Sequence, residues 1–290
     1  VTPDGTASAD ADRTGTDEPD APGRTRREYC YNILVSGLDD DNGGSDTNIL
    51  VRFDVPNKRI DLVSLPRDTL LHNEYRNNKL NFAYAKGGTE LLMEQIENLL
   101  GIPVDFYVTV NLKGFIALVD QIDGVDFDIP INMDYDDPYQ DLHIHFTKGP
   151  RHLNGQEAME VVRFRHNNDG TGYGTEDIGR IGTQQAFLKA VAKQLLQIGN
   201  VKNIPALVDI FYTYVKTDLT TGNLVWLGNE ALNIGTENIH FATLPGDGSG
   251  YYNKQSVYVL DAQATCDLVN EALNPYNEAL TLEDMDILVP

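Results

Sequence analysis

The chain has 290 residues, of which 41% are hydrophobic, and its formal net charge is -22 at pH 7. This length is enough for one large α/β domain or two small ones. Because nucleic-acid binding needs a basic surface for phosphate contacts, this charge and a sequence pI of ≈ 4.4 argue against nucleic acid as a partner.

The N-terminal residues 1–27 are rich in Asp, Thr, Gly, Pro and Arg and contain almost nothing that a core could bury. This composition predicts a disordered linker, followed by a compact domain over residues 28–290. The sequence begins at Val1 without an initiator Met, so we expect that an N-terminal segment was removed, either a tag, a signal peptide or a membrane anchor. The sequence contains no run of ~18 apolar residues, so it predicts no transmembrane helix within these 290 residues.

From Tyr29 onward, apolar runs bounded by turn residues alternate with capped amphipathic stretches. Residues 130–152 lack a helical period and are interpreted as a hairpin or excursion, and residues 156–165 as a short helix that runs into a strand. The alternation predicts one layered α/β domain. The predicted strands are 29–37, 48–55, 58–65, 104–110, 124–129, 239–244 and 256–260, and the predicted helices are 89–100, 112–121, 183–198, 204–214, 220–233 and 261–273.

The two cysteines, Cys30 and Cys266, leave two interpretations open. They form one disulfide, or they are buried thiols in a strand and a helix. Two cysteines are too few for a disulfide scaffold, and we favour the buried thiols.

Two aspartates flank the loop between the first two predicted strands. Asp39 ends the first strand, and Asp46 precedes the second. Two carboxylates at one edge of a sheet can bind Mg²⁺, which takes one or two protein carboxylates together with phosphate oxygens and water. A solvated acidic turn is the alternative, and Asp40 and Asp41 are competing ligands in the same loop.

Arginine is scarce beyond the N-terminal tail, and four of its eight positions there lie in short motifs, at Arg67, Arg163, Arg165 and Arg180. Pro66 ends the third strand, so Arg67 is expected at a strand end, where α/β folds often place ligand sites. Arg163 and Arg165 are two residues apart on a predicted strand, so they should share a face, and their repulsion favours an anion or a carboxylate between them.

Arg180 and Gln184 recur with Asp177 on one face of a predicted helix N-terminus, which favours anions. Guanidinium groups match phosphate oxygens in geometry and stay charged at any working pH. If the fold brings the arginines and aspartates together, they form a pocket for a phosphate or diphosphate. Each motif alone can also be explained by solvated surface charges.

His143 and His145 form a His-x-His pair on a possible strand, with His152 nearby. A zinc site would need a fourth ligand, which is not evident in the sequence. We therefore interpret these residues as exposed strand histidines.

Taken together and in order, the motifs resemble the LytR-CpsA-Psr (LCP) family over roughly residues 30–200. The agreement is specific because many separate motifs match in both sequence and spacing. The matching stretches are 32–39, 45–47, 64–69, 79–81 with Ala83 and Tyr84, Gly87 and Gly88, 108–114, Gly155 with Ala158, 163–165 and 177–185.

The resemblance implies a three-layer α/β/α sandwich with a central mixed sheet and an apolar cavity, or tunnel, for a lipid tail. It implies a membrane-anchored, extracytoplasmic phosphotransferase of a Gram-positive-type bacterium. Such an enzyme moves a glycopolymer, for example a teichoic acid or a capsule polymer, from a polyprenyl-diphosphate carrier to peptidoglycan. The membrane contact would run through the removed N-terminal anchor.

The resemblance also assigns roles to particular residues. Asp39 and Asp46 would hold Mg²⁺ or act as the catalytic acid or base, with Asp46 favoured for proton transfer. Catalysis would depend on Asp46, Arg67 and Arg163. The residues that would contact the diphosphate are Arg67, Arg163, Arg165, Arg180 and Gln184.

The sequence departs from the family pattern at two positions. Thr183 stands where family members often have an arginine directly before the glutamine, and Gly44 stands where a basic residue is frequent. These differences weaken the neutralisation of diphosphate charge, and Thr183 favours an alternative, a non-catalytic module that binds a polyprenyl diphosphate or the cell wall. A transcriptional regulator is a third hypothesis, against which the net charge and the lack of a basic recognition helix argue.

Overall fold

The computed structural model describes residues 23–38, 44–75, 77–139, 141–173, 176–195 and 211–289. They form two compact units that alternate along the chain. Unit 1 comprises the described parts of Val1–Ser36, Thr47–Thr109 and Lys216–Pro290, and unit 2 those of Gly37–Asp46 and Val110–Val215. Among the described residues, no helix is long and apolar enough to cross a membrane. The single domain over residues 28–290 stays a prediction.

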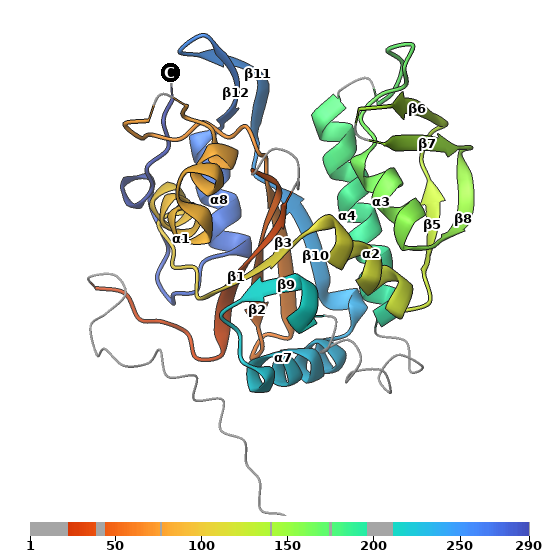
Figure 1. Ribbon diagram of the computed structural model, residues 1–290. Coiled ribbons are helices and arrows are strands. Elements are labelled where there is room, and N and C mark those ends of the chain that lie inside the picture. The colour runs from red at the N-terminus through yellow and green to blue at the C-terminus, as the bar shows by residue number, and fades with distance from the viewer. Residues whose placement is uncertain are drawn as a thin grey trace, which may run out of the picture. The chain divides into compact units, whose positions relative to one another are not determined.

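A six-stranded mixed sheet belongs mainly to unit 1 (Figure 1). The strand order is β10-β3-β2-β1-β4-β9, with β2 antiparallel and β10 parallel to β3. Because these strands are rich in β-branched and apolar residues, they suit a sheet that is buried on both faces. Their bounds are β1 Cys30–Leu38, β2 Ser45–Asp54, β3 Arg59–Leu65, β4 Phe106–Val110, β9 Val215–Thr217 and β10 Ile239–Thr243.

Helices cover both faces of this sheet within unit 1. They are α1 (Leu80–Leu100), α8 (Ala262–Ala272) and α7 (Thr221–Ile234). Leu34 of β1 shares one core with Leu92 of α1 and Val269 of α8. The ring of Tyr31 instead contacts Trp226 of α7, with 5.9 Å between the ring centroids. Tyr31 and Leu34 are three positions apart on one strand, so they point to opposite faces. The predicted α/β class with a central mixed sheet is confirmed, and the lipid tunnel stays a prediction.

The C-terminal part of α1 follows the sequence prediction. Gly101 ends the helix in the left-handed conformation with φ 66°, and its N–H donates to the Glu97 carbonyl, as expected for a glycine cap. Gly87 and Gly88 have non-helical backbone angles, so α1 consists of two helices that meet at a kink. The second helix follows Gly88, as the prediction for 89–100 requires, and the first, which begins at Leu80, was not predicted. Unit 1 also contains an antiparallel hairpin of β11 (Gly246–Tyr252) and β12 (Gln255–Leu260), of which only β12 was predicted.

In the part of unit 2 that the structure describes, three helices pack against two short antiparallel ladders. β5 pairs with β8, and β6 pairs with β7, which confirms the hairpin expected within residues 130–152. One apolar core joins Val119, Ile144, Val161 and Phe187. Its elements are α2 Leu112–Gln121, β5 Val125–Ile129, β6 Met133–Asp137, β7 Leu142–Phe146, β8 Gly149–Leu153, α3 Gly155–Arg163 and α4 Glu176–Leu195.

The prediction of a strand that carries Arg163 and Arg165 is wrong. Asn154 caps α3, its side chain accepting from the Glu157 N–H, and the helix continues to Arg163. Phe164 then turns into the core with 1% of its surface exposed, and its ring lies 5.5 Å from that of Tyr173. The chain leaves the helix at Phe164, whose side chain is buried in the core of unit 2. Arg163 and Arg165 therefore flank a buried residue instead of sharing one face of a strand.

The described residues 23–27 are held against unit 1 by arginine contacts, although the linker was predicted to extend to residue 27. Arg24 Nη2 lies 2.6 Å from Oδ2 of Asp284, and Arg27 Nη1 lies 2.9 Å from Oδ2 of Asp54. Arg26 pairs with Asp105. Ion pairs therefore hold residues 23–27 against unit 1, although their composition offers no apolar side chains for a core.

The Arg24–Asp284 pair predicts a small pH dependence of stability. The hydrogen bond from Arg24 lowers the pKa of Asp284 below its ordinary value of 3.8. A lowered pKa contributes stability above the unfolded pKa, and the contribution is lost as the pH falls through the folded one. Asp284→Asn should therefore reduce the free energy of unfolding by at most about 1 kcal/mol at neutral pH, with the gap closing in acid. A gap of constant size across this titration would contradict the linkage.

Both cysteines are buried free thiols, which confirms the favoured interpretation. Cys30 lies in β1 and Cys266 in α8, with 1% and 4% of their surfaces exposed. Burial raises the pKa of the Cys30 thiol to about 11, so this thiol stays protonated and unreactive at neutral pH.

A close helix contact in unit 2 requires glycine at position 155. A Cβ atom there would collide with the backbone carbonyl of Ile116 in α2, whereas a Cβ on Gly182 in α4 would meet nothing within 4 Å. We expect Gly155→Ala to lower the free energy of unfolding by about 1–3 kcal/mol, because α2 and α3 must separate. Gly182→Ala should be neutral or stabilise by up to about 1 kcal/mol through helix propensity. Urea unfolding of both variants checks the contrast, and equal effects would contradict it.

Candidate phosphate-binding site

Arg67 lies in a tight turn directly after β3, as the sequence predicted. The Thr69 N–H and hydroxyl both donate to the Pro66 carbonyl, at 3.0 and 2.6 Å, which closes the turn. The Arg67 carbonyl accepts from the Asn81 N–H at the start of α1, at 2.9 Å. The turn is thus fixed at both ends, so the backbone that presents the Arg67 side chain is rigid.

Two cations gather around one carboxylate at this turn. Asp68 Oδ1 lies 3.8 Å from Arg67 Nε and 3.2 Å from Lys79 Nζ. These side chains are between 20% and 28% exposed. Lys79 was not predicted as a site residue, although it lies in a stretch that matches the family. Its proximity depends on the chain returning from β3 to the start of α1, which no local pattern specifies.

In unit 2, the structure brings together Asp46 and Arg165, which stem from two separately predicted motifs. Arg165 Nη2 lies 4.0 Å from Asp46 Oδ2. The two side chains are 45% and 31% exposed, so both can reach a ligand from solvent. Asp46 lies near the start of β2, and Arg165 follows the buried Phe164.

The remaining predicted diphosphate residues also lie in unit 2. Arg163 ends α3, with Nη1 3.9 Å from Met159 Sδ. Arg180 lies in α4 with 6% of its surface exposed. Gln184 Nε2 donates to the Val162 carbonyl at 3.1 Å, so it fastens the end of α3 that presents Arg163. This contact gives Gln184 a positioning role beyond the predicted contact with diphosphate, which stays a prediction.

Thr183 contributes a neutral hydroxyl at a position where the family resemblance leads us to expect an arginine. Its Oγ1 donates to the Tyr173 hydroxyl at 2.8 Å, and 5% of its surface is exposed. Burial raises the pKa of Tyr173. Position 183 therefore links α4 to the segment after α3, and it brings no charge to the site.

The predicted Mg²⁺ ligands are only partly within the described residues. Asp46 offers one carboxylate with a partly exposed side chain, and hard oxygen donors of this kind suit Mg²⁺. The second predicted ligand, Asp39, lies outside the described residues, as does the side chain of Asp177. The convergence of Arg67 in unit 1 with Asp46 and the arginines of unit 2 stays a prediction.

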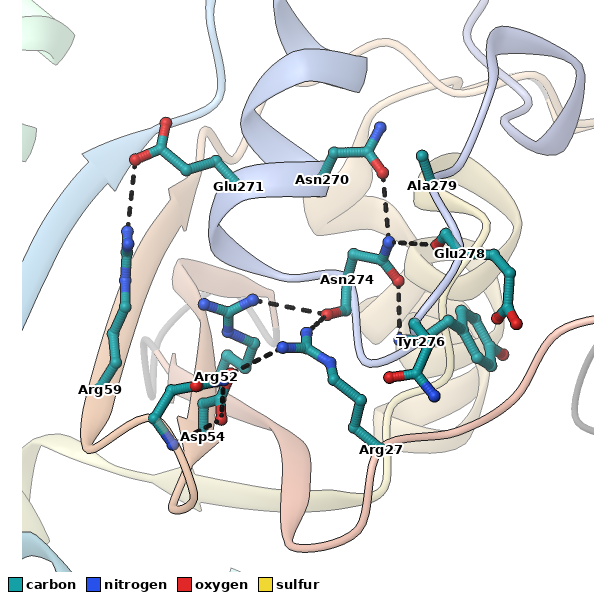
Figure 2. A pocket seen from close by; sticks show the side chains of 12 residues that line it. Arg27, Arg52, Asp54, Arg59, Asn270, Glu271, Asn274, Tyr276, Glu278 and Ala279 are labelled. Carbon is teal, nitrogen blue, oxygen red and sulfur yellow. Dashed lines mark hydrogen bonds and ion pairs between the residues drawn. The ribbon is translucent and has the colours of Figure 1, made fainter.

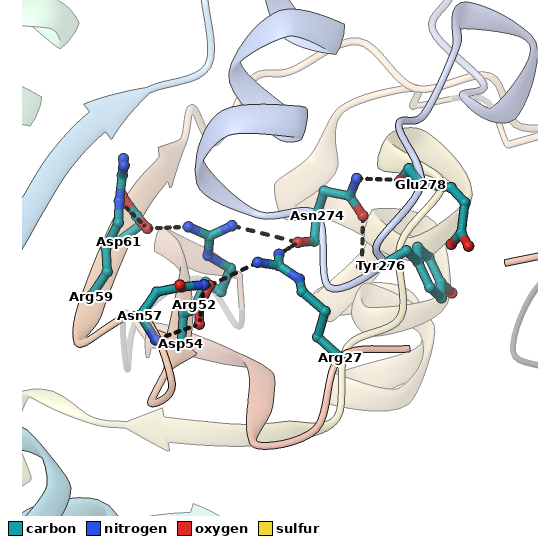
Figure 3. A network of polar contacts seen from close by, with 9 residues as sticks. All are labelled: Arg27, Arg52, Asp54, Asn57, Arg59, Asp61, Asn274, Tyr276 and Glu278. Atoms are coloured by element: carbon teal, nitrogen blue, oxygen red, sulfur yellow. Dashed lines mark hydrogen bonds and ion pairs between the residues drawn. The ribbon is translucent and has the colours of Figure 1, made fainter. Parts of the chain in front are cut away.

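A separate polar hollow of ≈ 370 Å³ lies in unit 1 (Figure 2). None of the predicted site residues lines it. Its arginines already face carboxylates: Arg27 pairs with Asp54, and Arg59 lies 3.4 Å from Glu271 (Figure 2). We therefore interpret the hollow as the surface of a structural ion-pair network that ties the N-terminal segment to β2, β3 and the chain after α8 (Figure 3).

The family model LytR_cpsA_psr matches residues 4–274. The chain belongs to the LytR-CpsA-Psr family. Among its LCP relatives, Polyisoprenyl-teichoic acid–peptidoglycan teichoic acid transferase TagV of Bacillus subtilis is 32% identical, over 81% of this chain and 61% of TagV. Polyisoprenyl-teichoic acid–peptidoglycan teichoic acid transferase TagU of Bacillus cereus is 31% identical, over 90% of this chain and 83% of TagU.

Two further comparisons place the LCP chain among known proteins. Regulatory protein MsrR of Staphylococcus aureus is 30% identical over 77% of this chain and 67% of its own length. The crystal structure of B. subtilis TagV superposes with a TM-score of 0.72 at 27% identity, covering 91% of this chain and all of the crystallised one. The LCP fold inferred from the sequence motifs is therefore confirmed.

Proposed function

We propose that the protein transfers a glycopolymer from a polyprenyl-diphosphate carrier to peptidoglycan during cell-wall assembly. The family and the named activity of the TagV and TagU relatives support a transferase. The observation that carries the proposal is the pairing of Asp46 with Arg165, because it joins an acid and a phosphate-binding cation at a surface open to solvent. The same relatives support an extracytoplasmic location, to which a membrane anchor ahead of residue 1 would hold the enzyme.

In the proposed reaction, a hydroxyl oxygen of peptidoglycan attacks the phosphorus on the glycan side of the diphosphate. The bond from that phosphorus to the bridging oxygen breaks, and polyprenyl phosphate leaves with the electron pair. Arg67, Arg163 and Arg165 would bind the phosphate oxygens, where charge develops in the transition state. Asp46 would take the hydroxyl proton or hold Mg²⁺, and bound Mg²⁺ would neutralise phosphate charge.

The test is transfer by the purified protein from a labelled polyprenyl-diphosphate glycan to isolated peptidoglycan. We expect label in the peptidoglycan together with release of polyprenyl phosphate, and loss of both when a chelator removes Mg²⁺. Activity that survives chelation and is unchanged by added Mg²⁺ would contradict the proposed role of Mg²⁺, but not the proposed transferase function.

A second candidate function is a binding module that retains the site without turnover. The neutral Thr183, buried against Tyr173, favours it because one frequent cation of the family is missing. Binding of the donor without release of polyprenyl phosphate, under conditions in which a TagV control transfers label, would replace the enzyme proposal with this one.

A further inference from the structure

The β6–β7 hairpin of unit 2 presents histidines and aspartates on one exposed face. In the antiparallel register, Asp134 lies opposite His145, and Asp136 lies opposite His143. Side chains two positions apart on a strand share a face, so all four point the same way. The other face is buried, with 1% of Met133 and none of Ile144 exposed. The apolar core therefore fixes the hairpin, and the polar face cannot rotate away from solvent.

One carboxylate of this face lies between two imidazoles. Asp136 Oδ1 is 2.5 Å from His143 Nδ1 and 3.3 Å from His145 Nε2. One ligand atom from each of these three residues lies within 4.8 Å of the others. Ligand atoms of a tetrahedral zinc ion are about 3.3 Å apart, given Zn–N and Zn–O bonds of ~2 Å. Small side-chain rotations would bring these three groups to that spacing.

Each imidazole has a second carboxylate at its other ring nitrogen. His145 Nδ1 lies 2.8 Å from Asp134 Oδ1, and His143 Nε2 lies 3.6 Å from Asp141 Oδ1. Metal-binding histidines in proteins usually donate their second ring N–H to a carboxylate, which fixes the tautomer and the ring orientation. The contact between His145 and Asp134 is short enough for this hydrogen bond, whereas Asp141 adds only its charge beside His143. The cluster also holds three carboxylates against two imidazoles, so its charge attracts a cation.

The backbone of β6 is anchored on the edge that does not face β7. The Asp134 N–H donates to Asn167 Oδ1 at 2.7 Å, and the Asp136 N–H donates to Asn168 Oδ1 at 2.6 Å. Asn168 Nδ2 in turn donates to the Asp136 carbonyl at 3.1 Å. Both aspartates are thus held in place by a segment that begins two residues after Arg165.

We propose that His143, His145 and Asp136 form a surface site for a divalent transition-metal ion of the zinc class, with Asp134 orienting the His145 imidazole. Imidazole nitrogen suits Zn²⁺ and its neighbours in the first transition row, whereas Mg²⁺ prefers oxygen ligands. The site is distinct from the proposed Mg²⁺ position at Asp46 and does not depend on the transferase function. The fourth zinc ligand is water.

The test is calorimetric titration of the untagged chain with Zn²⁺ in a buffer that contains excess Mg²⁺, which occupies oxygen-only sites. We expect one Zn²⁺ per chain. His143→Ala and His145→Ala should each weaken binding by about a hundredfold or more, and Asp134→Asn by about 10- to 100-fold. Co²⁺ in place of Zn²⁺ should give the visible absorption of a tetrahedral ion, which His145→Ala should abolish.

His152→Ala is the matched control. His152 is as exposed as His143 and His145, at 55% for each side chain, and also lies 2.8 Å from a carboxylate, that of Asp126. We expect this variant to bind Zn²⁺ like the parent. Because all three histidines are more than half exposed, far-ultraviolet circular dichroism without metal should be the same for every variant. No Zn²⁺ binding by the parent, or equal losses in His145→Ala and His152→Ala, would overturn the proposal.

Discussion

Replacing Arg165 by alanine is expected to lower the rate of glycopolymer transfer about a hundredfold, which corresponds to ~3 kcal/mol of transition-state stabilisation. Arg165 lies 4.0 Å from Asp46, and its guanidinium can form charge-assisted, two-pronged hydrogen bonds to phosphate oxygens. Arg165→Lys should recover only part of the rate, because a point charge cannot reproduce the fork. The measurement is initial rate with saturating Mg²⁺, and Arg67→Ala and Arg163→Ala should show losses of the same order.

Arg151→Ala is the matched control for Arg165→Ala. Arg151 also lies in unit 2, is 46% exposed against 45% for Arg165, and pairs with a carboxylate, Glu157, at 2.7 Å. It belongs to none of the predicted phosphate motifs, so its loss should leave the rate within about twofold of the parent, as for an exposed ion pair worth well under 1 kcal/mol. If Arg165→Ala and Arg151→Ala behaved alike in a parent that turns over, the assignment of Arg165 to the phosphate site would be wrong.

Replacing Asp61 by alanine is expected to lower the free energy of unfolding by about 3–5 kcal/mol. Asp61 lies opposite Arg52 in the β2–β3 ladder, and Arg52 Nη2 lies 2.7 Å from its Oδ2 (Figure 3). Both residues are almost fully buried, with 2% and 3% of their surfaces exposed. Without Asp61, the Arg52 guanidinium would stay in the interior with no counter-charge, which is far more costly than losing an exposed pair.

Two variants make the Asp61 result interpretable in urea unfolding. Glu271 is the other carboxylate beside Arg59; its side chain is 69% exposed and lies 3.4 Å from Arg59 Nη2. Glu271→Ala should therefore lower the free energy of unfolding by less than about 1 kcal/mol. The double variant Arg52→Leu with Asp61→Leu should recover most of the loss, because no buried charge is left unpaired. A loss for Asp61→Ala no larger than that for Glu271→Ala would contradict the buried-charge argument.

Local signals in the sequence predicted most helices and strands. The helix over 112–121 was predicted with its bounds correct, because Asn111 caps it by accepting from the Gly114 N–H. Predictions were wrong where distant contacts decide the local conformation. The burial of Phe164 ends α3 and removes the strand expected around Arg163 and Arg165. The glycine-rich β11 has little strand propensity of its own and forms because β12 pairs with it.

The candidate site shows the same division between local and distant information. The sequence could identify Asp46 and Arg165 as members of two motifs, but only the fold shows that they are paired. It could not identify Lys79 beside Asp68, or Asp136 between His143 and His145. The partners of these residues depend on a chain return and on the pairing register of a hairpin, and neither leaves a pattern in the individual segments.

The strand order of the mixed sheet has a consequence for synthesis of the protein. Both edge strands, β10 and β9, follow unit 2 in the chain, and Ile239 of β10 pairs with Ile60 of β3. A growing chain therefore exposes the unpaired edge of β4 until Thr217 has been made, and that of β3 until Thr243 has been made. Pairing of such distant segments is slow, and open strand edges invite association with other chains.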